Sequence, residues 1–364
     1  MKIKEVIKQI EESVPLNYAE DFDNVGLLVG DDKRELTGIL VALDTLEDTV
    51  DEAIAQNCNL IVAFHPIIFG GLKSLTGKTY VERVVQKAIK HDVQIYAIHT
   101  ALDNHLHGVN FKMAEVLGLT QTQILMPQKN TLMQLNTYVP LDHYSAVQQA
   151  LFSAGAGSVG NYDSCSFGLL GEGSFKPNNQ AQPHTGKPNE WHVGEEKMLH
   201  VVFEKHKQQK VLHAMFESHP YEEVAYELIP IANENQQIGI GMLGELPQAK
   251  TEKEFINQLK NVFGTPVIRH SALRQKPVKK VAVLGGSGAF AISAAISKGA
   301  DVLVTADLKY HDFFKAEDKI LLTDIGHYES EQFTKNLLHA LLTKKFPNFA
   351  IVLSEKSTNP IQYS

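Results

Sequence analysis

The chain has 364 residues, of which 43% are hydrophobic and 21% are charged, so it is long enough to bury more than one core. Its net charge of −8 argues against a nucleic-acid-binding surface, which is usually basic. The chain has only two cysteines, Cys58 and Cys165, and they are too far apart in the sequence to indicate a disulfide framework. The pattern of the first residues predicts an amphipathic helix rather than a signal peptide. No apolar stretch is long enough to cross a bilayer. We therefore expect a cytoplasmic protein.

The first third of the chain alternates between strand-like and helix-like patterns. Its β-rich runs predict strands over 38–44, 60–64 and 93–98. Its helical patterns cover 46–56, 78–90 and 109–117. Alternation of this kind indicates a mostly parallel α/β sheet.

The middle third, residues 129–236, has a different order of elements. Strands are predicted over 132–139, within 164–175, and over 198–204 and 224–231, with helices over 143–153 and up to about 216. The order β-α-β-β-α-β is typical of a ferredoxin-like fold, so we interpret this segment as a domain inserted into the α/β core. Residues 176–195 are polar and rich in Pro, Asn and Gly, which predicts a loop.

One motif of the inserted segment has two interpretations. Residues 219–223 read HPYEE, and they lie close to His213. These polar side chains could form a rim over a metal cavity, or they could be an exposed helix end and edge strand, where charged residues are common.

The last third, residues 237–364, returns to the α/β pattern. Strands are predicted over 279–284, 301–305 and 320–325, with a helix over 289–298. Residues 60–69 parallel 302–313, which indicates a weak internal duplication. The glycine-rich run 284–289 could bind a phosphate through backbone N–H groups, or it could be a tight structural turn.

Five side chains that can bind a metal follow the predicted strands: His65, His99, Asp103, His327 and Glu331. Each one alone is more often a cap or a satisfied polar group. If the strands are parallel members of one sheet, however, their carboxyl ends open onto the same crevice. His327 and Glu331 are also spaced to share one face of a helix, whose apolar stripe lies elsewhere, over 333–341. Imidazole and carboxylate groups without a thiolate predict a site for zinc, iron, manganese or a similar ion.

Five motifs carry a resemblance to a known family: DNVGL at 23–27, HPIIF at 65–69, HTALD at 99–103, TADLKYH at 305–311 and GHYESE at 326–331. With these motifs in this order, the chain resembles the GTP cyclohydrolase 1 type 2-like family, also called the NIF-three-like family, in its longer bacterial form. The inserted segment resembles the PII-like or CutA-like module of the longer members. The resemblance thus implies two similar α/β halves around a metal site, with an inserted ferredoxin-like domain.

The resemblance also implies two divalent metal ions per subunit, held by His65, Asp103, His327 and Glu331, and a ring-like homohexamer. The two carboxylates are natural bridging ligands. Many bacterial members have a His-His doublet where this chain has Phe64 before His65, and a phenyl ring cannot be a ligand. His99 is then a candidate neighbour of the site or part of its wall.

The chemistry implied by the family is the activation of water against a purine nucleotide. Asp307 and His311 follow a neighbouring strand and are candidates for general base, general acid or partners of ligand imidazoles, although Asp307 could equally cap a turn. The positive end of the helix that begins near Tyr328 would favour an anion. The alternatives are a dinuclear metal phosphoesterase and a non-catalytic protein that binds metal or has a regulatory role.

Overall fold

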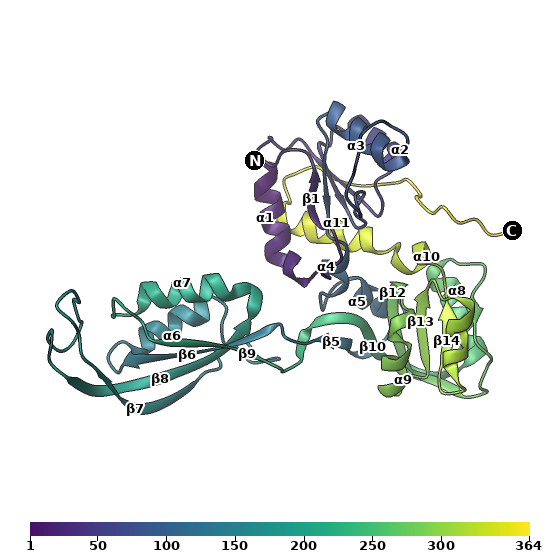
Figure 1. Ribbon diagram of the computed structural model, residues 1–364. Coiled ribbons are helices and arrows are strands. Elements are labelled where there is room, and N and C mark those ends of the chain that lie inside the picture. Colours follow the sequence, from purple (N-terminus) through teal and green to yellow (C-terminus); the bar gives the residue numbers. More distant parts are fainter. The chain divides into compact units, whose positions relative to one another are not determined.

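The computed structural model describes all residues, 1–364, and the chain forms two compact units (Figure 1). One unit consists of Met1–Pro127 and Gln237–Ser364, and is called the core unit below. The other consists of Gln128–Gln236 and is called the inserted unit. No helix has the length and apolar character needed to cross a lipid bilayer.

The first sheet of the core unit has five strands in the order β1-β4-β3-β2-β15. Their bounds are Gly26–Val29 for β1, Ile39–Ala42 for β2, Leu60–Ala63 for β3, Gln94–Ala97 for β4 and Ile351–Leu353 for β15. Four of the strands are parallel, and only β1, at one edge, is antiparallel to its neighbour. The prediction of a mostly parallel sheet in this half is therefore confirmed.

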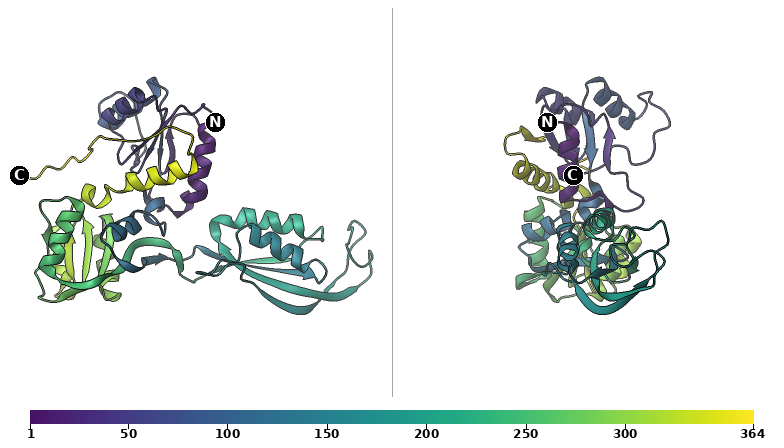
Figure 2. Two further views of the ribbon diagram at one scale, coloured as in Figure 1. Left: turned by 180° about the vertical axis from the view of Figure 1, so that it is seen from behind. Right: turned by 90° about the vertical axis from the view of Figure 1, so that its left-hand side faces the viewer.

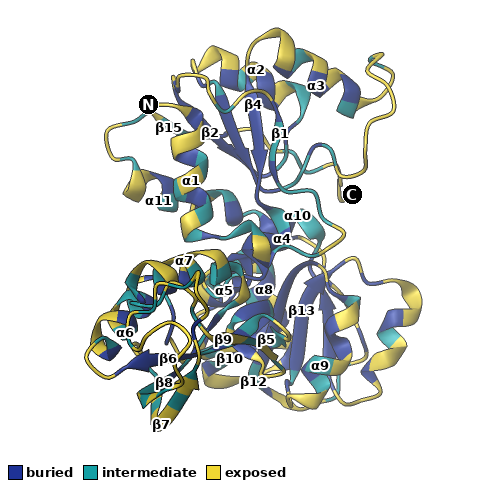
Figure 3. Ribbon diagram, turned by 60° about the vertical axis from the view of Figure 1, so that its left-hand side comes forward, coloured by how far each residue is buried: buried dark blue, intermediate teal, exposed yellow.

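Helices cover both faces of this sheet because successive strand residues point to opposite sides (Figures 1 and 3). Ile39 and Val41 pack with helices α1 (Ile3–Ser13) and α11 (Thr334–Lys345). Leu40 and Ala42 pack on the other face with α2 (Glu47–Ala55) and α3 (Tyr80–Lys90). Both faces of the central strands are buried, which explains their continuous apolar runs.

The second sheet of the core unit has six strands in the order β11-β14-β13-β12-β10-β5. Their bounds are Thr120–Gln128 for β5, Asn235–Thr251 for β10, Arg269–His270 for β11, Pro277–Ser287 for β12, Val302–Ala306 for β13 and Leu321–Asp324 for β14. The three strands β12, β13 and β14 are parallel, whereas β10 is antiparallel to β12 and β11 is antiparallel to β14. The sequence patterns did not predict β5 or β10.

The second sheet is also buried on two sides. Helices α5 (Val109–Val116) and α8 (Glu252–Phe263) supply apolar side chains to one face, and α9 (Ile292–Ser297) supplies them to the other. Helix α8 begins with a capping box, in which Thr251 and Glu254 satisfy each other's backbone N–H groups. It ends at Gly264, whose φ of +66° suits glycine.

The prediction of one continuous helix from His327 is wrong. The structure has α10 (His327–Glu331), of five residues, followed by α11 from Thr334. The break separates the polar segment with His327 and Glu331 from the apolar stripe, since Leu338 and Leu342 of α11 pack in the core.

The inserted unit has the elements β6 (Leu132–Pro140), α6 (Tyr144–Ser153), β7 (Phe167–Phe175), β8 (His192–Glu204), α7 (Gln208–Ser218) and β9 (Tyr226–Ile231). Its antiparallel sheet has the order β7-β8-β6-β9, and both helices lie on the same face, as the two opposite views agree (Figures 1 and 2). This is the β-α-β-β-α-β order that the sequence predicts. Strand β8 begins at His192, so the predicted loop 176–195 is shorter at its carboxyl end.

Candidate metal centre

The four predicted metal ligands follow strands along the chain, but these strands belong to two sheets rather than one. His65 follows β3, and Asp103 ends the short helix α4 (His99–Asp103) that follows β4. His327 and Glu331 are the first and last residues of α10, after β14. The site thus lies where the two sheets of the core unit meet, which corrects the expectation of a single crevice in one sheet.

Two of the predicted ligands, His65 and His327, converge on a carboxylate oxygen of a third, Glu331. Nε2 of His65 and Nε2 of His327 each lie 3.1 Å from Oε2 of Glu331. The two imidazole rings are 5.5 Å apart, centroid to centroid. The donor atoms of these three residues lie close enough together to hold one metal ion.

Asp103 is buried next to this group. Its side-chain oxygen Oδ1 has no hydrogen-bond partner. Burial and the nearby charge of Glu331 raise the pKa of Asp103 well above its usual value. A buried carboxyl oxygen without a partner is costly, and a cation is a natural partner for it.

Nδ1 of each of the two histidines lies within hydrogen-bond distance of a carboxylate, which orients the imidazole ring. Nδ1 of His65 lies 2.8 Å from Oδ1 of Asp44, and Nδ1 of His327 lies 2.6 Å from Oδ2 of Asp307. An imidazole that donates its Nδ1–H group to a carboxylate has the lone pair of Nε2 available for a metal. Asp307 also accepts a hydrogen bond from the Ser287 hydroxyl, at 2.5 Å. These contacts favour the role of Asp307 as a partner of a ligand imidazole over that of a turn cap; a general-base role remains a prediction.

The two histidines and Glu331 shift one another's pKa values. Burial lowers the pKa of His65, but hydrogen bonds and charges from Asp44 and Glu331 outweigh it and raise this pKa to about 10. Burial likewise lowers the pKa of His327, but Asp307 and Glu331 raise it to about 11. Burial raises the pKa of Glu331, whereas the two histidines lower it to about 2. In the metal-free protein, two imidazolium groups therefore provide the positive charge that Glu331 requires.

His99 is a neighbour of the centre rather than one of the converging donors. Its ring lies 5.3 Å from that of His65, and its Nδ1 lies 2.8 Å from Oδ1 of Asp23. The other oxygen of Asp23 accepts hydrogen bonds from the backbone N–H and hydroxyl of Thr100. Phe64 is fully buried in the apolar core, with its ring edge-on to His99, and so separates the core from the site.

Other sequence predictions fall outside this group. His311 is exposed, and its ring contacts Tyr310 and Phe314 instead of the converging donors. Helix α10 has only five residues, so the expected anion site at the positive end of a long helix is not supported.

The glycine-rich segment is neither a tight turn nor a phosphate loop, because Gly285 and Gly286 belong to the irregular end of β12. The N–H groups of Gly285 and Gly286 already donate to the side chains of Asn110 and Ser330, both at 2.9 Å. Gly286 has a φ of +66°, and a Cβ atom there would overlap Oε1 of Glu331. The glycine therefore lets β12 approach the carboxylate of the centre.

These residues fit a divalent metal ion. The donor set comprises two imidazoles, whose Nε2 atoms both lie near Glu331, and two buried acidic side chains, which suits zinc, iron or manganese. Asp103 supplies a buried oxygen without a partner, and Asp44 and Asp307 supply the outer carboxylates that ligand histidines commonly have.

Sequence reasoning missed Asp44, Asp23 and the carboxy-terminal segment. Asp44 ends the predicted strand 38–44, and Asp23 begins the DNVGL motif, so both had a signal in the sequence. The hydroxyl of Thr358 donates to Asp44, and Asn359 donates to Glu329 at 3.0 Å. Nothing in the composition of this last segment indicates that it reaches the site.

The fold and the site define a protein with two α/β sheets around a candidate centre of two imidazoles and two carboxylates. The sequence model of the Duf34/NIF3 family (NGG1p interacting factor 3) matches residues 1–360. Two relatives named GTP cyclohydrolase 1 type 2 homolog are each 39% identical to the chain. That of Halalkalibacterium halodurans aligns over 363 residues, 98% of both chains, and that of Bacillus subtilis over 369 residues, 99% of this chain and 98% of the relative.

Solved structures agree with this assignment. The crystal structure of a Bacillus cereus protein related to NIF3 has a TM-score of 0.89 at 34% identity, and that of a Staphylococcus aureus protein has a TM-score of 0.81 at 31% identity. Each comparison covers 100% of this chain and 99% of the other. The chain belongs to the Duf34/NIF3 family.

Proposed function

We propose that the chain is a divalent-metal-dependent hydrolase that acts on a purine nucleotide, with two ions held by His65, Asp103, His327 and Glu331. The observation that carries the proposal is the convergence of two oriented imidazoles on a buried carboxylate, beside a second buried carboxyl without a partner. The purine nucleotide is suggested by the name of the relatives, GTP cyclohydrolase 1 type 2 homolog.

When bound, the ions would supply a Lewis acid that lowers the pKa of a bound water. The protein's own part is to hold the donors in place. Asp44 and Asp307 fix the ring orientation and tautomer of the two histidines, Glu331 supplies negative charge, and Asp103 supplies a further oxygen. Because ligation requires neutral imidazoles, metal binding must release the protons that Nε2 of each histidine holds in the metal-free protein.

A metal centre does not by itself specify a substrate, since the same donor arrangement suits phosphate ester hydrolysis or a non-catalytic role. The position before His65 bears on this choice. Phe64 is buried in the core and cannot supply the additional imidazole that many family members have. We therefore expect the second metal ion to bind with lower affinity than the first.

The first test is metal content per subunit, for protein purified without added metal, in the wild type, in Glu331→Gln and in Glu317→Gln. Glu317 is exposed and lies outside the centre, so its substitution is the matched control. We expect about two ions in the wild type and the control, and their loss in Glu331→Gln.

The metal-loaded protein is then incubated with GTP and with phosphate esters, and the products are separated by chromatography. The proposal is supported if the wild type opens the purine ring of GTP and Glu331→Gln does not. Phosphate release with an intact ring would establish a phosphoesterase instead. Metal binding without turnover of GTP or of the phosphate esters would contradict the proposal and support a non-catalytic metal-binding role.

A further inference from the structure

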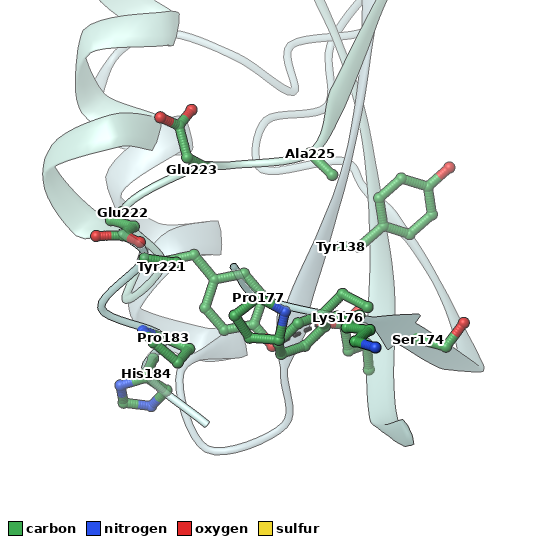
Figure 4. A pocket seen from close by; sticks show the side chains of 13 residues that line it. Tyr138, Ser174, Lys176, Pro177, Pro183, His184, Tyr221, Glu222, Glu223 and Ala225 are labelled. Atoms are coloured by element: carbon green, nitrogen blue, oxygen red, sulfur yellow. Dashed lines mark hydrogen bonds between the residues drawn. The ribbon is translucent and has the colours of Figure 1, made fainter. Parts of the chain in front are cut away.

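The inserted unit contains a cavity of about 320 Å³ beside the β7–β8 connection (Figure 4). Its walls include Tyr138, Phe175, Pro177, His184, Glu196 and Tyr221. Tyr221 belongs to the HPYEE motif and donates its hydroxyl to Glu196 at 2.6 Å. The motif thus forms part of a cavity inside the inserted unit.

His219, the first residue of that motif, has a structural role. It is buried, its Nε2 lies 3.0 Å from the carbonyl oxygen of Tyr138, and its Nδ1 accepts the N–H of Tyr221 at 3.2 Å. Both ring nitrogens are therefore occupied.

A second group of possible metal ligands lies at the edge of the cavity. The donor atoms of Asp142, His143 and His184 all lie within 4.8 Å of one another. The rings of His143 and His184 are 5.1 Å apart, close to the 5.5 Å between His65 and His327. We propose that Asp142, His143 and His184 form a second metal site, which binds a divalent transition-metal ion and fixes the β7–β8 connection against the start of α6.

The chemistry of the donors selects the class of ion. Two imidazoles and one carboxylate suit Zn²⁺, Ni²⁺ or Cu²⁺ rather than Mg²⁺ or Ca²⁺, which prefer oxygen ligands. Three protein ligands leave at least one coordination position open. Because Asp142 and His184 are exposed, this position is accessible to water or to a ligand group that occupies the cavity.

The β7–β8 connection is held in place on both sides of His184. The N–H of Gln182 donates to Glu222 at 2.7 Å, and the N–H of Asn189 donates to the carbonyl oxygen of Pro177 at 2.7 Å. These bonds reduce the conformational freedom that metal binding would otherwise have to remove. The site therefore needs little rearrangement to accept an ion.

The chain offers a built-in reporter for this site. Trp191, the only tryptophan, is exposed at the end of the same connection, directly before β8. Its fluorescence should respond to Ni²⁺, a paramagnetic quencher, bound at His184. The test titrates the metal-free full-length protein with Ni²⁺ and follows this fluorescence.

We expect saturable quenching in the wild type and a loss of affinity of more than about 100-fold in His184→Ala and His143→Gln, since removal of a direct ligand should exceed the effect of removing an outer partner. After loading with excess Zn²⁺, zinc content per subunit should be one ion lower in both variants than in the wild type loaded in the same way. His213→Ala, which removes an exposed histidine of the same unit, and Glu331→Gln, which disrupts the centre of the core unit, should both retain the quenching.

Wild-type titration curves in both His184→Ala and His143→Gln would overturn the proposal. So would quenching that disappears only in Glu331→Gln, because it would then report the centre in the core unit. Far-ultraviolet circular dichroism of each variant tests whether the fold is retained. His143 and His184 lie on different segments of the chain, so one local disruption of structure would not explain a loss of Ni²⁺ affinity in both variants.

Discussion

The outer carboxylates Asp44 and Asp307 allow a quantitative test of the metal centre. Each accepts a hydrogen bond from Nδ1 of a histidine, at 2.8 Å and 2.6 Å respectively. Substitution by Asn keeps the size of the side chain but removes the charge, and its amide group can also stabilise the imidazole tautomer that carries a proton on Nε2. That tautomer cannot bind a metal through Nε2.

The expected loss of metal affinity follows from these contacts. Removing the outer partner of a ligand histidine typically weakens metal binding by about 10–100-fold, or about 1.4–2.7 kcal/mol. The Asp307 side chain is 43% exposed and the Asp44 side chain 31%, so solvent screens Asp307 more strongly. We therefore expect the loss of metal affinity to be near the lower end of this range for Asp307→Asn and nearer the upper end for Asp44→Asn.

The assay is zinc binding in competition with a chromophoric chelator, for metal-free wild type, both variants and Asp318→Asn. Asp318 is exposed and remote from the donors, so this control changes the net charge equally. Affinities of both variants within twofold of the control would refute the assigned role of these carboxylates. An effect of Asp307→Asn larger than that of Asp44→Asn would refute the argument from screening.

Three further predictions concern the surroundings of the centre. Asp103→Asn should lower metal content while leaving the melting temperature of the metal-free protein nearly unchanged, because burial raises the pKa of Asp103 and so favours its neutral form, which an amide resembles in size and charge. Phe64→Ala should lower the free energy of unfolding in urea by about 3–5 kcal/mol, since the ring is fully buried, whereas Phe69→Ala, at a half-exposed ring, should change it little. Burial raises the pKa of Asp23, but hydrogen bonds from His99 and Thr100 outweigh it and lower the pKa to about 2, so its ionised form should stabilise the protein by about 2 kcal/mol above pH 4. This contribution is lost as the pH falls towards 2, so the stability difference between wild type and Asp23→Asn, from urea midpoints at pH 7 and pH 3, should shrink at the lower pH.

Much of the candidate site was predictable from the sequence because the residues that could bind a metal follow strong strand patterns. The runs before His65 and His327 are β3 and β14, and each is buried on both faces, which requires continuous apolar residues. The carboxyl ends of such strands are where polar side chains can leave the core. The residue types and this shared position were sufficient to group the ligands.

The assignment of the ligands to two sheets was not predictable, because strand patterns do not encode which strands pair. The two longest strands that were missed, β5 and β10, have mixed burial and polar residues at many positions. Their hydrogen bonds come from partners distant in sequence, so no local period marks them. Asp44 and Asp23 were missed for a related reason: their partners, His65 and His99, lie 21 and 76 residues away.

Gly286 provides a test of the centre that removes no donor. Its φ is +66° and an added Cβ would overlap Oε1 of Glu331, with Cε1 of His327 at 3.3 Å. Gly264, which ends α8, has the same φ of +66° but no atom within 4 Å of the corresponding Cβ. Alanine at either position costs about 1–2 kcal/mol of backbone strain, but only Gly286→Ala also displaces the carboxylate. We expect Gly286→Ala to lose metal affinity by at least about 10-fold relative to Gly264→Ala, in the same chelator competition. Equal affinities in the two variants would show that the position of Glu331 is not critical for metal binding, and the arrangement of His65, His327 and Glu331 would then not be the metal site.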